Sequence, residues 1–236
     1  MTRDAWHDSG FARNWDESSN LQTNPDRLRQ LTLVADLVAA ANPDCLLDLG
    51  VGSAQVEFVI RQRHLEFFNR CHVIGIDASA AMLSLAQERC ESEGLSNVEF
   101  IEGDFKSLES LQLSRKPDAA ICVQALHEVP HAVKQAVFKR VHDWLPPGAP
   151  FYILDRFAYS DTPWGDDWKA VWNWMSSQVS GKVIGFEEYH DRYSAKTDHI
   201  ASVQEYRTWL EAEGFDTLCP YQSFNRAMII ARRRPA

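Results

Sequence analysis

Short hydrophobic runs alternate with amphipathic stretches along the first part of the chain. The runs are typical of buried strands and cover residues 45–49, 72–77, 98–101, 119–123 and 151–154. Amphipathic helices are predicted before and between them, over residues 24–42, 54–64, 79–93 and 131–145. Strands that alternate with helices in this order predict an α/β fold with a doubly wound, mostly parallel sheet.

The alternation breaks after the fifth strand. Residues 156–201 are aromatic and acidic and predict a helical or irregular insertion, which we expect to act as a lid. A helix over residues 203–213 follows, and the last two hydrophobic runs, 215–224 and 227–231, are close enough to form an antiparallel hairpin. We therefore expect a single domain. Its parts are a helical cap (1–42), a core (43–155), a lid insertion (156–201) and a closing helix with a hairpin (202–236).

Composition narrows the class of protein. The 236 residues carry a formal net charge of −9, which disfavours a nucleic-acid partner because such proteins present clusters of Lys and Arg. The five cysteines are scattered without a C-x-x-C pair, which is typical of reduced thiols in the cytoplasm. No apolar run is long enough for a membrane helix. We expect a soluble cytoplasmic protein with no membrane partner, as a monomer or homodimer.

Acidic residues lie at or just after the carboxyl ends of three of the predicted parallel strands. Asp48 precedes Gly50-Val51-Gly52 where the first strand turns into a helix, Asp77 ends the second strand, and Asp104 follows the third. The carboxyl ends of parallel strands meet at one edge of the sheet, where glycines let a ligand approach the backbone and a carboxylate can accept ribose hydroxyls. These positions predict a nucleotide-type ligand crevice.

Four segments in this order resemble the motifs of the class I S-adenosylmethionine-dependent methyltransferases, and the resemblance extends over nearly the whole chain. They are residues 46–52, 73–83, 98–105 and 117–127. The resemblance implies a Rossmann-like fold with a reversed C-terminal hairpin. It also implies S-adenosylmethionine as cofactor and S-adenosylhomocysteine as product. Ala54 departs from the family, which often has a third glycine there.

The resemblance also assigns cofactor contacts along the crevice. Asp48 would hold the glycine loop, and Asp77 would hold the ribose. Ala78, Met82, Asp104 and Phe105 would surround the adenine, and Gly50, Gly52, Val123 and Gln124 would contact the methionine part.

Two other chemistries are disfavoured. A nicotinamide-dependent dehydrogenase usually keeps G-x-G-x-x-G with an acid about 20 residues further on, whereas Gln55 stands in the last glycine position and the acid lies further away. His127-Glu128-Val129-Pro130-His131 fits the H-E-x-x-H pattern of zinc peptidases. Since Pro130 favours the first turn of a helix, the two histidines are not expected on one continuous helix, and we predict no metal site.

The sequence gives fewer indications of which residues would bind the methyl acceptor. His127 follows the fourth strand, beside the expected position of the transferred methyl group, and is a candidate general base; it could equally brace the cofactor loop or cap the following helix. His190, in the insertion, is a second candidate. The insertion is rich in aromatic residues that suit a core or an acceptor pocket: Tyr159, Trp164, Trp168, Trp172, Trp174, Phe186, Tyr189 and Tyr193. Such a wall favours a small acceptor of aromatic or cationic character. The N-terminal stretch, which includes Trp6 and Trp15, is expected to fold over the same opening.

The leading hypothesis is methylation of a small molecule on oxygen or nitrogen. Two alternatives stay open. The C-terminal segment also resembles enzymes that make or use carboxylated S-adenosylmethionine, in which Arg226 or Arg156 would pair with the added carboxylate. The other alternative is a non-catalytic protein that only binds the cofactor.

Overall fold

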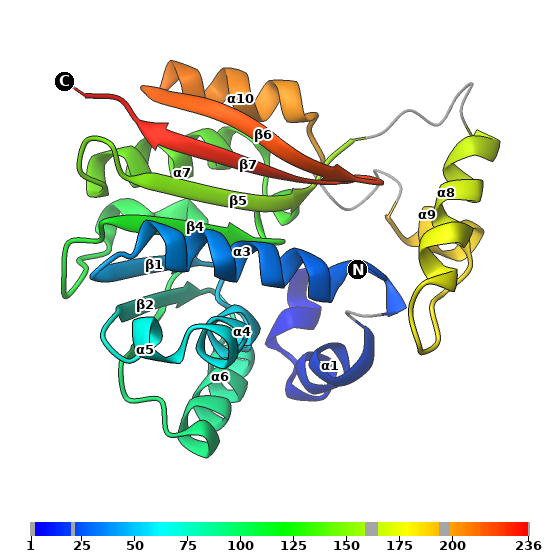
Figure 1. The fold of residues 1–236 in the computed structure, drawn as a ribbon, viewed down its shortest axis with the longest axis horizontal. Coiled ribbons are helices and arrows are strands. Elements are labelled where there is room, and N and C mark those ends of the chain that lie inside the picture. The colour runs from blue at the N-terminus through cyan, green and yellow to red at the C-terminus, as the bar shows by residue number, and fades with distance from the viewer. Residues whose placement is uncertain (1–2, 20–21, 159–164, 194–198, 236) are drawn as a thin grey trace.

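The computed structural model describes residues 3–19, 22–158, 165–193 and 199–235. Within these residues one seven-stranded sheet has the order β3-β2-β1-β4-β5-β7-β6 (Figure 1). The strands are β1 (Cys45–Leu49), β2 (His72–Asp77), β3 (Val98–Glu102), β4 (Ala119–Val123), β5 (Pro150–Arg156), β6 (Phe215–Ser223) and β7 (Arg226–Arg233). The first five are parallel, and β7 pairs antiparallel with both β5 and β6. The predicted doubly wound sheet with a C-terminal hairpin is confirmed.

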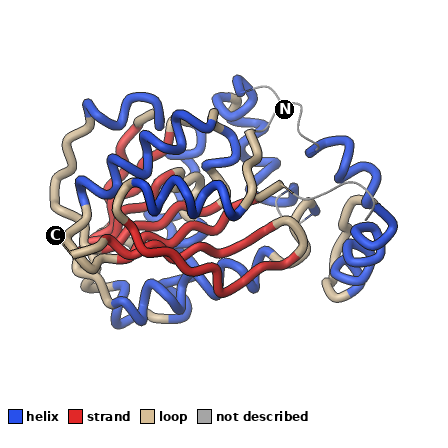
Figure 2. The backbone as a smooth tube through the Cα atoms, turned by 90° about the horizontal axis from the view of Figure 1, so that it is seen from above, coloured by secondary structure: helices blue, strands red, loops and turns tan. Residues whose placement is uncertain are grey.

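Helices cover both faces of the sheet, as the view from above shows (Figure 2). They are α3 (Arg27–Ala41), α4 (Gln55–Arg63), α5 (Leu65–Phe68), α6 (Ala80–Glu93), α7 (His131–Trp144) and α10 (Val203–Ala212). The side chains of α3, α4 and α5 form one hydrophobic cluster with the sheet, and those of α7 and α10 form another on the opposite face. This double coverage explains why β1, β4 and β5 are buried along their whole length and are hydrophobic without alternation.

The helix ends follow the local chemistry of the sequence. The hydroxyl of Ser79 accepts a hydrogen bond from the Met82 N–H at the start of α6, and Gly94 ends that helix in a left-handed conformation. Ser202 and Glu205 form a capping box at the start of α10. Among the described residues, no helix is both long enough and apolar enough to span a membrane.

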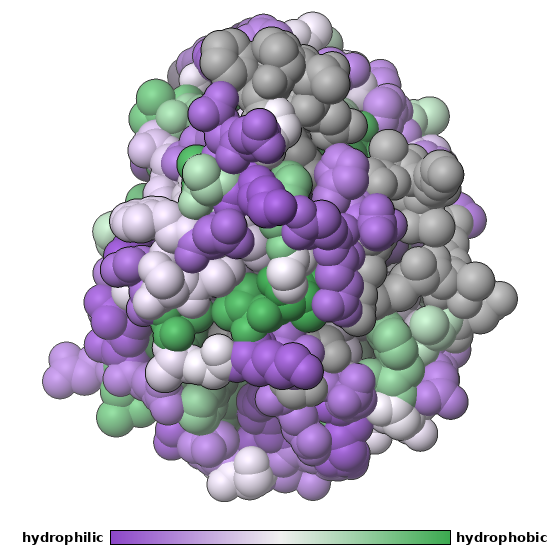
Figure 3. All heavy atoms as spheres, turned by 90° about the vertical axis from the view of Figure 1, so that its right-hand side faces the viewer, coloured by the Kyte–Doolittle hydropathy of each residue, from purple (hydrophilic) through white to green (hydrophobic). Residues whose placement is uncertain are grey.

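The insertion contains two ordered helices, α8 (Gly165–Ser177) and α9 (Phe186–Tyr193), so its described part is more regular than the sequence indicates. Trp172 is buried, stacks on Tyr189 at 4.1 Å between ring centroids, and packs with Phe224 from the β6–β7 turn. Trp174, by contrast, is 62% exposed. Tyr159 and Trp164 lie outside the described residues. On this side of the molecule a compact hydrophobic patch interrupts a largely hydrophilic surface (Figure 3).

The N-terminal segment forms η1 (Arg3–His7), α1 (Ser9–Asn14) and η2 (Trp15–Ser19). It lies at the edge of the sheet where the parallel strands end, as does the insertion (Figure 1). Both segments therefore flank the edge at which the sequence predicts a ligand crevice.

Candidate functional site

A cavity of about 310 Å³ opens at the carboxyl ends of β1, β2, β3 and β4, and we call it the strand-end cavity. Nine of the ten residues predicted to contact a cofactor line it: Gly50, Gly52, Asp77, Ala78, Met82, Asp104, Phe105, Val123 and Gln124. They come from four separate strand ends, so it is the parallel sheet that brings them together.

The glycine loop after β1 is shaped by close backbone approach. Gly50 has φ 78°, and a Cβ atom there would lie 2.4 Å from the Cβ of Ala125. Gly52 has φ 56°, and its N–H donates to Asp77 Oδ2 at 2.9 Å. The Ser79 N–H donates to the other carboxylate oxygen of Asp77, also at 2.9 Å. Asp77 therefore ties the glycine loop to the start of α6 while its side chain lines the cavity.

Ala54, which stands where the family often has a glycine, adopts a backbone conformation that glycine adopts more easily. It has φ 59° and is the residue immediately before α4, in a left-handed conformation that costs an L-residue about 1–2 kcal/mol. The third glycine of related sequences would adopt this conformation without strain. The loop keeps its shape here despite the alanine.

Asp48 is the predicted contact that does not line the strand-end cavity. It is buried beneath the glycine loop near Glu57 of α4, and none of the four carboxylate oxygens of this pair has a hydrogen-bond partner among the described residues. Burial first, and then the neighbouring Glu57, raise the pKa of Asp48, while burial raises the pKa of Glu57. Two adjacent buried carboxylates cannot both ionise readily, so burial and proximity favour the protonated form of this pair.

Arg27 lines the cavity although the sequence analysis did not single it out. It is 5% exposed and lies beside the Trp15 ring, at 5.2 Å from its centroid. Its guanidinium donates to the side-chain oxygens of Gln55, at 2.7 and 3.0 Å, and of Gln124, at 3.1 Å. Burial first, and then the charge of Arg226, lower the pKa of Arg27 to about 10. From sequence, an arginine in the first turn of a helix gives no signal that distinguishes it from a solvated residue.

The N-terminal segment closes one side of the cavity through Trp6, His7 and Trp15. Asp16 fastens this segment: it accepts hydrogen bonds from Ser53 Oγ and from Gln55 Nε2 at 2.6 Å, and it pairs with Arg89 of α6 at 2.7 Å. The expected cover over the opening thus has a defined attachment to the glycine loop and α6.

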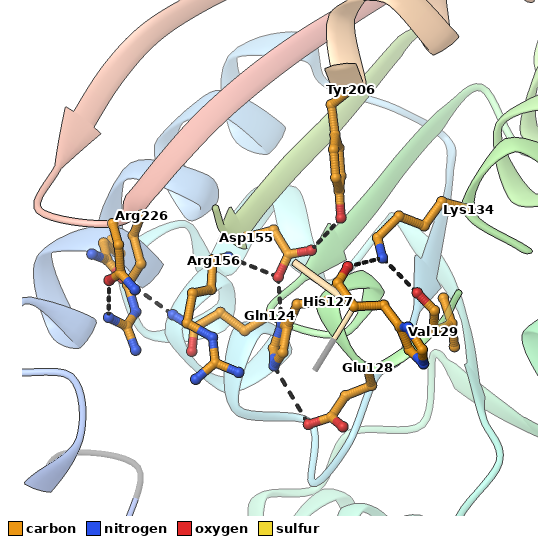
Figure 4. A network of polar contacts seen from close by, with 12 residues as sticks. Gln124, His127, Glu128, Val129, Lys134, Asp155, Arg156, Tyr206 and Arg226 are labelled. Carbon is orange, nitrogen blue, oxygen red and sulfur yellow. Dashed lines mark hydrogen bonds and ion pairs between the residues drawn. The ribbon is translucent and has the colours of Figure 1, made fainter. Parts of the chain in front are cut away.

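His127 lies behind the cavity wall rather than on it. It belongs to η4 (Leu126–Glu128), is 9% exposed, and places Nδ1 at 2.6 Å from Asp155 Oδ1 and Nε2 at 3.4 Å from Glu128 Oε1 (Figure 4). The Tyr206 hydroxyl donates to Asp155 Oδ2 at 2.9 Å. Of this network, Glu128 is the member that lines the cavity.

The charges of the network raise the pKa of His127 and lower the pKa of Glu128. Burial and Arg156 lower the pKa of His127, but the Asp155 and Glu128 carboxylates outweigh them, so this pKa is raised overall. Burial acts to raise the pKa of Glu128, and the hydrogen bond and charge of His127 reverse this, so the pKa of Glu128 is lowered overall. Glu128 therefore presents an ionised carboxylate to the cavity, held by His127, which lies between the carboxylates of Asp155 and Glu128.

The other candidate residues are not brought to the cavity. His190 lies on α9 with its ring against Phe186, 5.9 Å between centroids, and no described residue of the insertion lines the strand-end cavity. His127 and His131 lie on separate elements, η4 and α7, with Pro130 between them. The described residues contain no group of three or more potential metal ligands.

Comparison with known proteins supports the fold and its domain. Residues 46–148 match a family model described as a methyltransferase domain. The chain is similar to a carboxy-S-adenosyl-L-methionine synthase from Pseudomonas fluorescens, with 27% identity over 221 residues that cover 88% of this chain and 83% of that protein. Similar synthases from Citrobacter koseri and Salmonella are 22–23% identical.

Solved structures show the same architecture. An O-methyltransferase family protein from Burkholderia thailandensis superposes with a TM-score of 0.70 at 14% identity, over 98% of this chain and 62% of that one. This chain thus spans less than two thirds of that protein's length. The magnesium protoporphyrin IX methyltransferase of Synechocystis, with bound S-adenosylhomocysteine, superposes with a TM-score of 0.66 at 16% identity, over 98% of this chain and 97% of that one.

Proposed function

We propose that this chain, a class I S-adenosylmethionine-dependent methyltransferase by its domain and its fold, methylates a small molecule on oxygen or nitrogen. The observation that carries the proposal is the strand-end cavity, where nine residues predicted from four separate motifs come together. In this proposal Asp77 binds the ribose, Ala78, Met82, Asp104 and Phe105 surround the adenine, and the glycine loop with Val123 and Gln124 receives the methionine part.

Arg27 completes the cofactor site in this proposal. It is a buried cation on the cavity wall, and its hydrogen-bond acceptors among the described residues, Gln55 and Gln124, are both neutral. A carboxylate that enters the cavity would gain a charge-assisted hydrogen bond there. We assign Arg27 to the carboxylate of the methionine part.

Glu128 is proposed as the group that receives the acceptor proton. When bound, S-adenosylmethionine supplies a methyl group on an already activated sulfonium, so the C–S bond breaks as the acceptor lone pair forms the new bond. The residues then have to orient the acceptor and remove one proton. Glu128 offers an ionised carboxylate on the cavity wall, and His127, fixed by Asp155, holds it in place. This assigns His127 to positioning instead of direct proton abstraction.

A second candidate is the synthesis or use of carboxylated S-adenosylmethionine. It is supported by the names of the curated relatives and by the buried arginines Arg156 and Arg226 beside the network of His127. Mass spectrometry of the cofactor that copurifies with the protein separates the two candidates, because the carboxylated form is heavier by one carboxyl group.

Titration calorimetry with S-adenosylmethionine and S-adenosylhomocysteine tests the proposed site. We expect binding of about micromolar strength that Asp77→Ala abolishes. Asp216→Ala, whose side chain is exposed on β6, is the matched control and should bind as the wild type does. Failure of the folded protein to bind either ligand would overturn the proposal.

Turnover distinguishes an enzyme from a non-catalytic binder. With an accepted substrate, Glu128→Gln should lower kcat by about 100-fold or more, the usual contribution of a general base, while S-adenosylhomocysteine still binds. Binding of S-adenosylmethionine without formation of S-adenosylhomocysteine across a broad acceptor panel would instead favour the hypothesis of a protein that only binds the cofactor.

A further inference from the structure

Two buried arginines face each other at the carboxyl end of β5. Arg156 on β5 and Arg226 on β7 are register partners in the antiparallel pair, so their side chains leave the same face of the sheet. They are only 3% and 6% exposed. Arg156 follows Asp155 directly, and its guanidinium points to the side of the sheet edge where His127 and Glu128 lie (Figure 4).

Arg226 makes hydrogen bonds only to neutral groups among the described residues. Its guanidinium donates to the Tyr189 hydroxyl at 3.1 Å, to Asn225 Oδ1 at 2.9 Å and to the Thr23 carbonyl at 3.2 Å. Its Nε atom is buried without a partner. A buried cation without a carboxylate is costly, and proteins normally pair or neutralise such a charge.

The surroundings of Arg226 add positive charge. Arg27 is close enough to Arg226 for the two charges to destabilise each other, which contributes to the lowered pKa of Arg27. The buried carboxylate Asp155 accepts hydrogen bonds from Tyr206 and from the Arg156 N–H, and it pairs with His127. Among the described residues, Arg27 and Arg226 are therefore two buried cations close to each other, and neither is hydrogen-bonded to a carboxylate.

We infer that the methyl acceptor carries an oxyanion, a carboxylate or phosphate group, and that Arg226 together with Arg156 binds it beside Glu128. The inference rests on the proposed methyltransferase function and names the acceptor class of the same site. A guanidinium matches a two-oxygen anion with parallel hydrogen bonds, which a neutral hydroxyl or amide cannot supply. The proposed acceptor is therefore anionic, whereas the sequence led us to expect an acceptor of aromatic or cationic character.

Entry of the anion requires a small movement of α9. The Tyr189 hydroxyl of α9 accepts a hydrogen bond from Arg226 in this structure. Asn225 forms a hydrogen bond of 2.9 Å with each of these two side chains. The incoming oxyanion takes the place of the Tyr189 hydroxyl on Arg226. The insertion thereby contributes to acceptor binding even though its described residues do not line the strand-end cavity.

Matched acceptor pairs test the inference. The probes are 3,4-dihydroxybenzoate and its amide, 4-aminobenzoate and its amide, and inorganic phosphate as a competitor, each titrated into protein saturated with S-adenosylhomocysteine. We expect the carboxylates to bind about tenfold or more tightly than the amides and phosphate to compete with them. Equal binding within both pairs, or no carboxylate binding up to about 10 mM, overturns the inference.

Variants of Arg226 test whether this residue causes the preference for carboxylates over amides. Arg226→Gln should remove the preference for carboxylates, and Arg226→Lys should restore part of it. Arg232→Gln, an exposed position on the same strand, should leave it unchanged. A preference that survives in Arg226→Gln contradicts the assignment. If Arg226→Gln weakens binding of carboxylated S-adenosylmethionine but not of the benzoates, the anion belongs to the donor and the inference is wrong.

The same variants separate this inference from the proposed function. S-adenosylhomocysteine should bind Arg226→Gln with wild-type affinity, because the cofactor site lies in the strand-end cavity. Loss of cofactor binding by the wild-type protein would overturn the proposed function, whereas loss of the carboxylate preference alone would overturn only the anionic acceptor.

Discussion

Removal of the Asp16 side chain should open the N-terminal cover of the strand-end cavity. Asp16 accepts hydrogen bonds from Ser53 of the glycine loop and Gln55 of α4, and it pairs with Arg89 of α6. The side chains of Arg89 and Asp16 are 24% and 14% exposed, so solvent screens this ion pair only in part. Asp16→Ala removes all three contacts and leaves Trp6 and Trp15 without this attachment over the cavity.

The size of the effect follows from the contacts that are lost. A hydrogen bond to a charged group contributes about 1.5–3 kcal/mol net when buried, and partial exposure of Asp16 reduces the sum of its contacts to about 2 kcal/mol. If the closed cover holds the cofactor, a loss of about 2 kcal/mol weakens binding by about thirtyfold. We expect most of this in a faster dissociation rate, because the cover has to open before the ligand leaves.

The matched control is Glu88→Ala. Glu88 also joins the cover to α6, through Arg13 at 3.1 Å, but the two side chains are 56% and 55% exposed. Exposed pairs of this kind contribute little, so Glu88→Ala should bind as the wild type does. Calorimetry with S-adenosylhomocysteine gives the affinities, and stopped-flow tryptophan fluorescence gives the dissociation rates. Wild-type affinity in Asp16→Ala, or equal weakening in both variants, would refute the reasoning.

Two further predictions concern the glycine loop and the carboxyl pair beneath it. Gly50→Ala should lower the free energy of unfolding by about 3 kcal/mol, from left-handed strain and from the contact with Ala125, and Ala125→Gly should recover the contact part in urea denaturation. Glu57→Gln should stabilise the protein increasingly as the pH rises from about 4 to 8. Burial raises the folded pKa values of Asp48 and Glu57, so the wild type loses stability as the pH rises through them, and a variant whose stability tracks that of the wild type at every pH would contradict the raised pKa values.

The central strands could be predicted from sequence to the residue. Residues 45–49, 72–77 and 119–123 coincide with β1, β2 and β4. These strands are covered on both faces, so burial demands an uninterrupted hydrophobic run whose ends are visible in the chain. The cavity contacts are also local in sequence, because each lies at a strand end that the pattern already locates. The assignment of cofactor contacts remains a prediction, although nine of them meet in one cavity.

The acceptor side depends on contacts between distant segments and gave weaker signals. The insertion packs around Phe224, which lies in the β6–β7 turn with φ 52°, a rare conformation for a bulky residue. Nothing in residues 165–193 specifies this partner. From sequence alone, Asp155 lies at the end of a predicted strand and Tyr206 lies on one face of a predicted helix, and neither position indicates a partner. The hydrogen bonds of Asp155 to Tyr206 and to His127 form only when β5, η4 and α10 are assembled.

The anion site links acceptor choice to the register of the C-terminal hairpin. Arg226 faces Arg156 because β7 pairs with β5 in one register, and side chains alternate between the two faces of a strand. A shift of one residue would turn Arg226 to the opposite face and bring a neighbour to its place. The same hairpin positions Phe224, against which the insertion packs, so a change of register would remove the arginine and the support of α9 together. The reversed hairpin therefore does more than close the sheet: it sets the charge of the acceptor side, while the parallel strands bring together the residues of the cofactor side.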